Sequence, residues 1–116
     1  MSHHPDRPAS PNPVLNLVSY YPKEGKEEDF LSLLEKHWPT LDRMGLVTKR
    51  APQFWRAFDV RANKSYFVEM FEWKDGRAPD VAHQSPEVMA IWEPMTPMLE
   101  HMQITEVEPL SFARQA

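Results

Sequence analysis

The sequence predicts a single small α+β domain with the element order βαββαβ and an antiparallel sheet. Two observations predict this fold: several runs are rich in β-branched and aromatic residues, and two segments repeat apolar residues at three- and four-residue steps. The length of 116 residues fits one domain, because two domains of half that size would each bury too little surface. This element order is that of the ferredoxin-like fold.

Both ends of the chain are expected to lie outside this domain. Residues 1–13 carry four of the twelve prolines and no aliphatic side chain larger than alanine apart from Met1. We therefore expect a mobile arm there, in which His3 and His4 are weak evidence for a metal site. The domain is expected to span residues 14–110, and residues 111–116 form a tail.

The first strand and the first helix are expected at the start of the domain. The strand is the run VLNLVSYY, which is closed by Pro22. The helix is expected over residues 26–44, where Gly45 favours a stop and acidic residues stand near the positive N-terminal end. Pro39 should kink or split this helix, because proline removes one helical hydrogen bond. Its apolar stripe comprises Phe30, Leu33, Leu34, Trp38, Leu41 and Met44.

A hairpin is expected next. Its strands cover residues 47–60 and 65–74, and the segment RANK between them contains Asn63, which suits a turn.

A second helix and a last strand complete the expected order. Ser85 can cap the helix and Pro86 can take its first position, whereas Pro94 and Pro97 should break it into short pieces. The last strand is expected over residues 101–107. The apolar stripe of the second helix comprises Val88, Met89, Ile91, Trp92, Met95 and Met98.

Composition excludes several classes of function. The net charge of −4 provides no basic field for a phosphate backbone, so we expect no nucleic-acid partner. The absence of cysteine excludes disulfides and thiolate metal sites, and no run approaches the length of a membrane span. We expect a cytoplasmic protein with no metal site, phosphate loop or nucleophile triad.

The strands themselves predict a homodimer. An antiparallel sheet with helices on one face normally alternates apolar and polar residues, yet these strands carry large apolar residues on both faces. Two helices can cover only one face, so a second copy of the chain is the simplest cover for the other. The residues on opposite faces are Val14, Val18 and Tyr20 against Leu15, Leu17 and Tyr21, and Tyr66, Val68 and Met70 against Phe67, Phe71 and Trp73.

The segments FEWKDG at residues 71–76 and VAHQSP at residues 81–86 resemble the antibiotic biosynthesis monooxygenase-like group of the dimeric α/β-barrel superfamily. The first looks like that group's tryptophan-ended strand, and the second like its entry to the second helix. The resemblance covers about residues 14–109. It implies a dimeric barrel, and its members include cofactor-independent oxygenases of aromatic compounds.

A haem-degrading branch of the superfamily uses a strand-one asparagine, a strand-three tryptophan and a helix-two histidine that ligates iron. Asn16 and Trp73 match the first two positions. The third falls at or near Trp92, whose indole cannot bind iron, and His83 lies too early on that second helix. We therefore expect no haem and no other cofactor.

Two residues are candidates for catalysis. Asn16 stands among apolar residues, and its amide either orients a substrate oxygen or is a satisfied strand residue. His83 either takes a phenolic proton as general base or braces the loop before the second helix.

Other residues are candidates for substrate binding. Glu69 either projects into the barrel or pairs with Arg56 across the hairpin. Trp55, Trp73 and Trp92, together with Tyr20, either wall a flat aromatic pocket or belong to the core. His37 and His101 are interpreted as surface or packing residues.

Two functions remain open from the sequence. The first is a cofactor-independent monooxygenase of a small aromatic or quinol-type compound, and the second is a non-catalytic dimeric module that binds an apolar metabolite.

Overall fold

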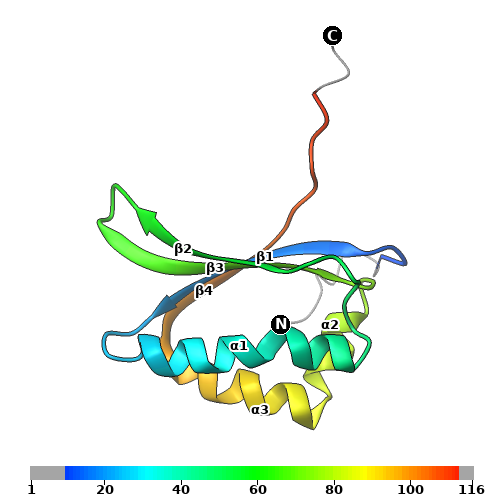
Figure 1. Cartoon of the computed structure of the whole chain (residues 1–116), viewed down its shortest axis with the longest axis horizontal. Helices are drawn as coiled ribbons and strands as arrows, with labels where there is room; N and C mark the ends of the chain where they lie inside the picture. The colour runs from blue at the N-terminus through cyan, green and yellow to red at the C-terminus, as the bar shows by residue number, and fades with distance from the viewer. Residues whose placement is uncertain (1–9, 113–116) are drawn as a thin grey trace.

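The computed structural model describes residues 10–112 and has a four-stranded antiparallel sheet with its helices on one face (Figure 1). The α+β class and the βαββαβ order are confirmed. The sheet order is β2-β3-β1-β4. The strands are β1 (Val14–Pro22), β2 (Gln53–Asp59), β3 (Lys64–Trp73) and β4 (Leu99–Glu106). The helices are α1 (Glu27–Arg43), α2 (Ala78–His83), α3 (Pro86–Met95) and the 3-10 turn η1 (Thr96–Met98). His3 and His4 lie outside the described residues.

Strand β1 lies at the centre of the sheet and fixes which side chains face the helices. Asn16 pairs with Phe71 of β3 and Glu106 of β4, and Tyr20 pairs with Phe67 and Met102. Because side chains alternate along a strand, Asn16 and Tyr20 share the face that the helices cover. The core on this face includes Val18, Phe30, Leu34, Leu41, Phe67, Phe71, Trp73, Val88, Ile91 and Met95.

The helix α1 is continuous through Pro39, so the expected break there is wrong. Phe30 and Leu34 before the proline and Leu41 after it are buried in one core, and this shared packing holds a single helix. Pro39 lacks the N–H that would donate to the backbone carbonyl group one turn earlier in the helix. Because Pro39 is exposed, water can donate to that carbonyl group instead.

The hairpin turn is confirmed, because Asn63 has a φ of 55°. Strand β2 begins later than expected, at Gln53, and Val47 makes only an isolated bridge with Trp73. Pro52 explains the late start, since proline cannot donate to a strand ladder.

The second helical region differs from the expectation in two ways. Ser85 caps α3 as expected, since its hydroxyl accepts from the N–H of Val88 at 3.3 Å. However, α3 runs through Pro94 to Met95 before it tightens into η1. The short helix α2 was not expected. Its N-terminus is held by Asp75, whose carboxylate accepts from backbone N–H groups of Arg77 at 2.9 Å and Ala78 at 3.0 Å.

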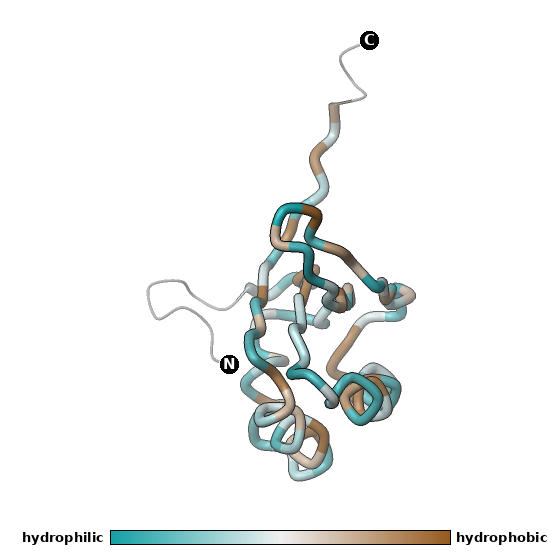
Figure 2. The backbone as a smooth tube through the Cα atoms, turned by 90° about the vertical axis from the view of Figure 1, so that its left-hand side faces the viewer, coloured by the Kyte–Doolittle hydropathy of each residue, from teal (hydrophilic) through white to brown (hydrophobic). Residues whose placement is uncertain are grey.

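The other face of the sheet carries no helix among the described residues (Figure 1). Tyr21 and Tyr66 stack there with ring centroids 4.6 Å apart, and Leu17 pairs with Met70. The segment after β4 rises on this side, away from the helices, and alternates hydrophobic and hydrophilic residues (Figure 2). We call this surface, formed by Leu17, Tyr21, Trp55, Tyr66, Val68 and Met70, the open face.

Candidate functional site

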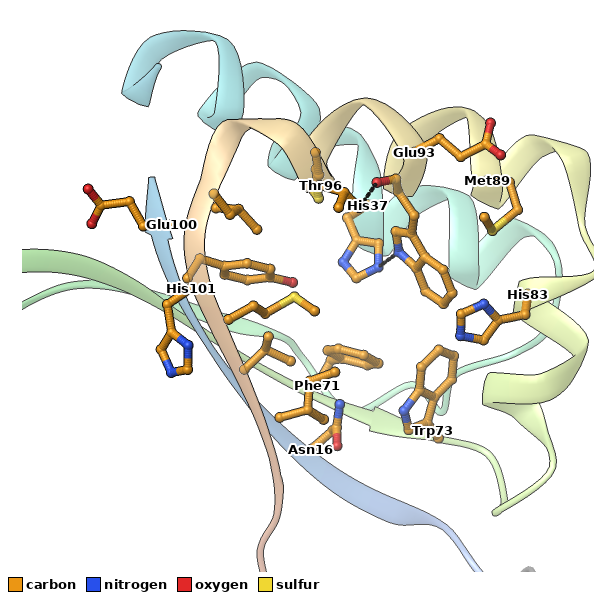
Figure 3. A pocket seen from close by; sticks show the side chains of 17 residues that line it. Asn16, His37, Phe71, Trp73, His83, Met89, Glu93, Thr96, Glu100 and His101 are labelled. Carbon is orange, nitrogen blue, oxygen red and sulfur yellow. Dashed lines mark hydrogen bonds between the residues drawn. The ribbon is translucent and has the colours of Figure 1, made fainter. Parts of the chain in front are cut away.

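A pocket of about 490 Å³ lies between the sheet and the helices (Figure 3). Its walls come from β1, β3 and β4 on one side and from α1, α2, α3 and η1 on the other. Its volume falls in the range of about 300–1,000 Å³ that is typical of small-molecule sites. The predicted site residues that line it are Asn16, Tyr20, Trp73, His83 and Trp92, beside the apolar Val18, Phe71, Met89, Met95, Leu99, Met102 and Ile104.

The sheet side of the pocket holds two buried groups that can donate hydrogen bonds. Trp73 is 2% exposed, and its indole N–H is buried without a hydrogen-bond partner in residues 10–112. Asn16 is also 2% exposed and lines the same wall, where its amide offers two N–H donors. In Figure 3 the indole nitrogen of Trp73 lies on the side toward Asn16. The sheet side of the pocket therefore carries two N–H donor groups among its apolar side chains.

We call the wall formed by Asn16 and Trp73 the donor wall. His83 lies near it, at the C-terminal end of α2. Its side chain is partly exposed, and its ring meets the ring of Trp92 edge-on with centroids 4.8 Å apart. Figure 3 shows the side chains of His83 and Trp73 next to each other at one end of the pocket. The structure thus brings together Asn16, Trp73 and His83, three residues that the sequence singled out.

The helix side of the pocket contains a chain of hydrogen bonds through four elements. The hydroxyl of Tyr20 donates to Oε1 of Glu69 at 2.6 Å, and Nδ1 of His37 lies 2.8 Å from Oε2 of the same carboxylate. The indole Nε1 of Trp92 donates to Nε2 of His37 at 2.8 Å. The chain therefore joins β1 and β3 to α1 and α3.

The chemistry of indole fixes the protons in this chain. An indole N–H can only donate, so Nε2 of His37 must accept, and a neutral His37 carries its proton on Nδ1. His37 then donates to Glu69, which is fully buried and accepts from two donors. Burial, followed by the nearby Glu69 carboxylate, raises the pKa of Tyr20 well above its usual value. Tyr20 therefore stays a protonated donor at neutral pH.

The expected pairing of Glu69 with Arg56 is wrong. The register of the hairpin places Arg56 opposite Phe67, not opposite Glu69. Arg56 instead forms an ion pair with Glu27 at 3.0 Å, and its guanidinium lies 4.7 Å from the centroid of the Phe67 ring. Glu69 does not line the pocket, but it supports two residues that do.

The expected position of Trp55 in the aromatic pocket is also wrong. Trp55 pairs with Val68, so it lies on the open face, where it is 44% exposed. A shift of one residue in strand register would place Trp55 on the helix-facing side instead. The residues of β2 do not alternate clearly between apolar and polar, so the sequence could not decide between the two faces.

His37 and His101 were interpreted from the sequence as surface or packing residues, yet both line the pocket. His101 is exposed, whereas His37 is only 3% exposed. A signal for His37 existed, because it lies three residues after Leu34 and four before Leu41 on the buried stripe of α1.

Two absences bear on the site. In the part of the chain that the structure describes, no cluster of three or more His, Asp or Glu residues is suited to hold a metal ion. Within residues 10–112, no helix has the length and apolar character needed to cross a membrane.

Comparison with known proteins yields matches to solved structures only, since no family model and no curated protein matches the sequence. A crystal structure of an antibiotic biosynthesis monooxygenase has a TM-score of 0.66 at 12% identity, over 84% of this chain and 99% of that one. SnoaB, a cofactor-independent oxygenase from Streptomyces nogalater, has a TM-score of 0.65 at 13% identity, over 88% and 97%.

A third similar structure is Rv0793 from Mycobacterium tuberculosis, with a TM-score of 0.67 at 16% identity, over 88% of this chain and 99% of that one. Likeness at these identities concerns the fold, which these proteins share along nearly their whole length. The chain therefore has the ferredoxin-like fold of the antibiotic biosynthesis monooxygenases.

Proposed function

We propose that this protein is a cofactor-independent monooxygenase of a small aromatic or quinol-type compound. The observation that carries the proposal is the buried N–H of Trp73, which has no partner in residues 10–112 and belongs to an apolar pocket. A buried donor without a partner costs about 1–3 kcal/mol. A ligand oxygen would remove that cost, and the aromatic walls suit a planar ring.

Asn16 and His83 extend this donor wall into a reactive site. A phenolic oxygen bound by Asn16 and Trp73 is stabilised as an oxyanion, and His83 takes its proton. The ring then becomes electron-rich enough to react with O2. One oxygen atom stays on the ring as a carbonyl group and the other leaves as water, so the phenol becomes a quinone. The substrate supplies all four electrons, and no external reductant is needed.

The fold supports the same proposal in a weaker sense. Structures with this fold include SnoaB, described as a cofactor-independent oxygenase. One scaffold hosts many chemistries, so the pocket residues rather than the fold carry the argument.

A second copy of the chain is proposed to cover the open face. This face holds large apolar side chains, and beyond it Leu110 is 75% exposed and Phe112 is 71% exposed. A patch of this kind on a lone chain marks an association surface. Sedimentation equilibrium at micromolar concentration should give the dimer mass, and a stable monomer there would contradict the homodimer.

Oxygen uptake with 1-naphthol tests the proposed activity. The expected product is 1,4-naphthoquinone, with one O2 consumed for each quinone formed. His83→Ala should lower the rate by about 100-fold or more while the oligomeric state is unchanged. An unaffected rate would remove His83 from the reaction. Thermal stabilisation by 1-naphthol with no oxygen uptake would instead identify a binding module.

A further inference from the structure

An acceptor of hydrogen bonds faces the donor wall across the pocket. Figure 3 shows His37 on the helix side, while Asn16 and Trp73 lie on the sheet side. The atom of His37 that accepts is Nε2, since Nδ1 is engaged with Glu69 at 2.8 Å. The pocket therefore has donors at one wall and an acceptor at the opposite one.

Two contacts hold this acceptor ready. Glu69 is fully buried and binds the Nδ1 side of the ring, which fixes the tautomer and makes Nε2 a stronger acceptor. Trp92 donates to Nε2 at 2.8 Å, so it occupies the position in which a ligand hydroxyl would stand. Trp92 is only partly buried and itself lines the pocket.

We infer that His37 binds a second hydroxyl of the ligand, which replaces the indole N–H of Trp92 at Nε2. The inference rests on the proposed function, because it concerns the same pocket, and it narrows the substrate class. The ligand is a planar aromatic compound with oxygens on opposite sides. One oxygen accepts from Asn16 and Trp73, and the other donates to His37.

If the ligand hydroxyl replaces the indole N–H at Nε2, the affinity for such ligands depends on Trp92. In the free protein Trp92 satisfies His37, so an incoming hydroxyl only replaces one hydrogen bond with another. Without the indole N–H, the buried Nε2 atom lacks a donor until the ligand hydroxyl arrives. Removing that N–H should therefore favour ligands with a hydroxyl over those without one.

Two probes of nearly equal shape test this inference. The compound 2-acetyl-6-hydroxynaphthalene carries an acceptor and a donor at opposite ends. In 2-acetyl-6-methoxynaphthalene a methyl group replaces the hydroxyl proton, so that end can no longer donate. Their dissociation constants are measured by fluorescence for the wild type, Trp92→Phe and Trp38→Phe. Trp38 is a matched control, because it does not line the pocket and its indole N–H has no partner in residues 10–112.

We expect Trp92→Phe to tighten binding of the hydroxy probe by about 5-fold or more relative to the methoxy probe. Trp38→Phe should leave that ratio unchanged. An unchanged ratio in Trp92→Phe would overturn the inference, and so would equal tightening of both probes, since that reports only the space left by the smaller ring.

Two further results separate this inference from the proposed function. If both probes bind the wild type and Trp73→Phe weakens both, the donor wall stands whatever the ratio in Trp92→Phe. If neither probe binds any variant, the inference and the proposed function fail together. In the wild type, the hydroxy probe should shift the NMR signal of the Trp92 indole N–H further than the methoxy probe does, because only the hydroxyl replaces its hydrogen bond to His37. Equal shifts with both probes would contradict the exchange at His37.

Discussion

Replacing Tyr20 with phenylalanine removes one hydroxyl from the buried chain of hydrogen bonds and leaves the ring in place. That hydroxyl donates to Glu69 at 2.6 Å, and Glu69 is fully buried. A hydrogen bond to a charged group contributes about 1.5–3 kcal/mol. The free energy of unfolding should fall by about that amount, which lowers the melting temperature of a domain of this size by about 6–12 °C.

Urea unfolding of Tyr20→Phe and Tyr21→Phe, at one protein concentration, measures this effect. Tyr21 is the matched control, since it lies on the open face with its ring stacked on Tyr66. Its replacement removes the same hydroxyl on the other face of β1, away from Glu69, and should be less destabilising than Tyr20→Phe. If Tyr20→Phe is no more destabilising than Tyr21→Phe, Glu69 does not depend on the Tyr20 hydroxyl and the reasoning fails.

Three other predictions follow from single contacts. Because the pKa of Tyr20 is raised in the folded protein, the phenol ionises at lower pH in the unfolded chain. In thermal melts the wild type should therefore lose stability as pH rises above about 10, and more steeply than Tyr20→Phe. Parallel curves of melting temperature against pH for the two proteins would contradict this. Ser85→Ala removes the cap of α3 and should cost about 0.5–2 kcal/mol in urea unfolding, whereas an unchanged midpoint would show that the cap is dispensable. Leu17→Lys places a charge on the open face and should yield monomers in sedimentation, and a persistent dimer would exclude this face as the interface.

The elements of the fold could be predicted from the sequence because their signals are local. The apolar steps of α1, the cap at Ser85 and the turn at Asn63 each depend on neighbouring residues. The errors at Pro39 and Trp55 arose where local signals yield to packing. A core shared on both sides of Pro39 overrides its cost, and strand pairing decides which face Trp55 occupies.

The donor wall was accessible from the sequence, but the hydrogen-bond chain was not. Asn16 is a polar residue among apolar neighbours, and Trp73 ends a strand, so both can be singled out from the sequence alone. The contact between His37 and Glu69 joins residues 32 positions apart, and that between Trp92 and His37 joins residues 55 apart. No spacing rule connects such residues, since only the packing of α1 and α3 on the sheet brings them together.

The binding of 2-acetylnaphthalene compared with 2-ethylnaphthalene tests the central claim most directly, because the two compounds differ mainly in one oxygen. The wild type should bind the ketone at least about 5-fold more tightly, since its oxygen accepts from the unpartnered N–H of Trp73. Trp73→Phe should lose this preference. Equal affinity of the wild type for both compounds would contradict the claim that the pocket is built to hold a ligand oxygen.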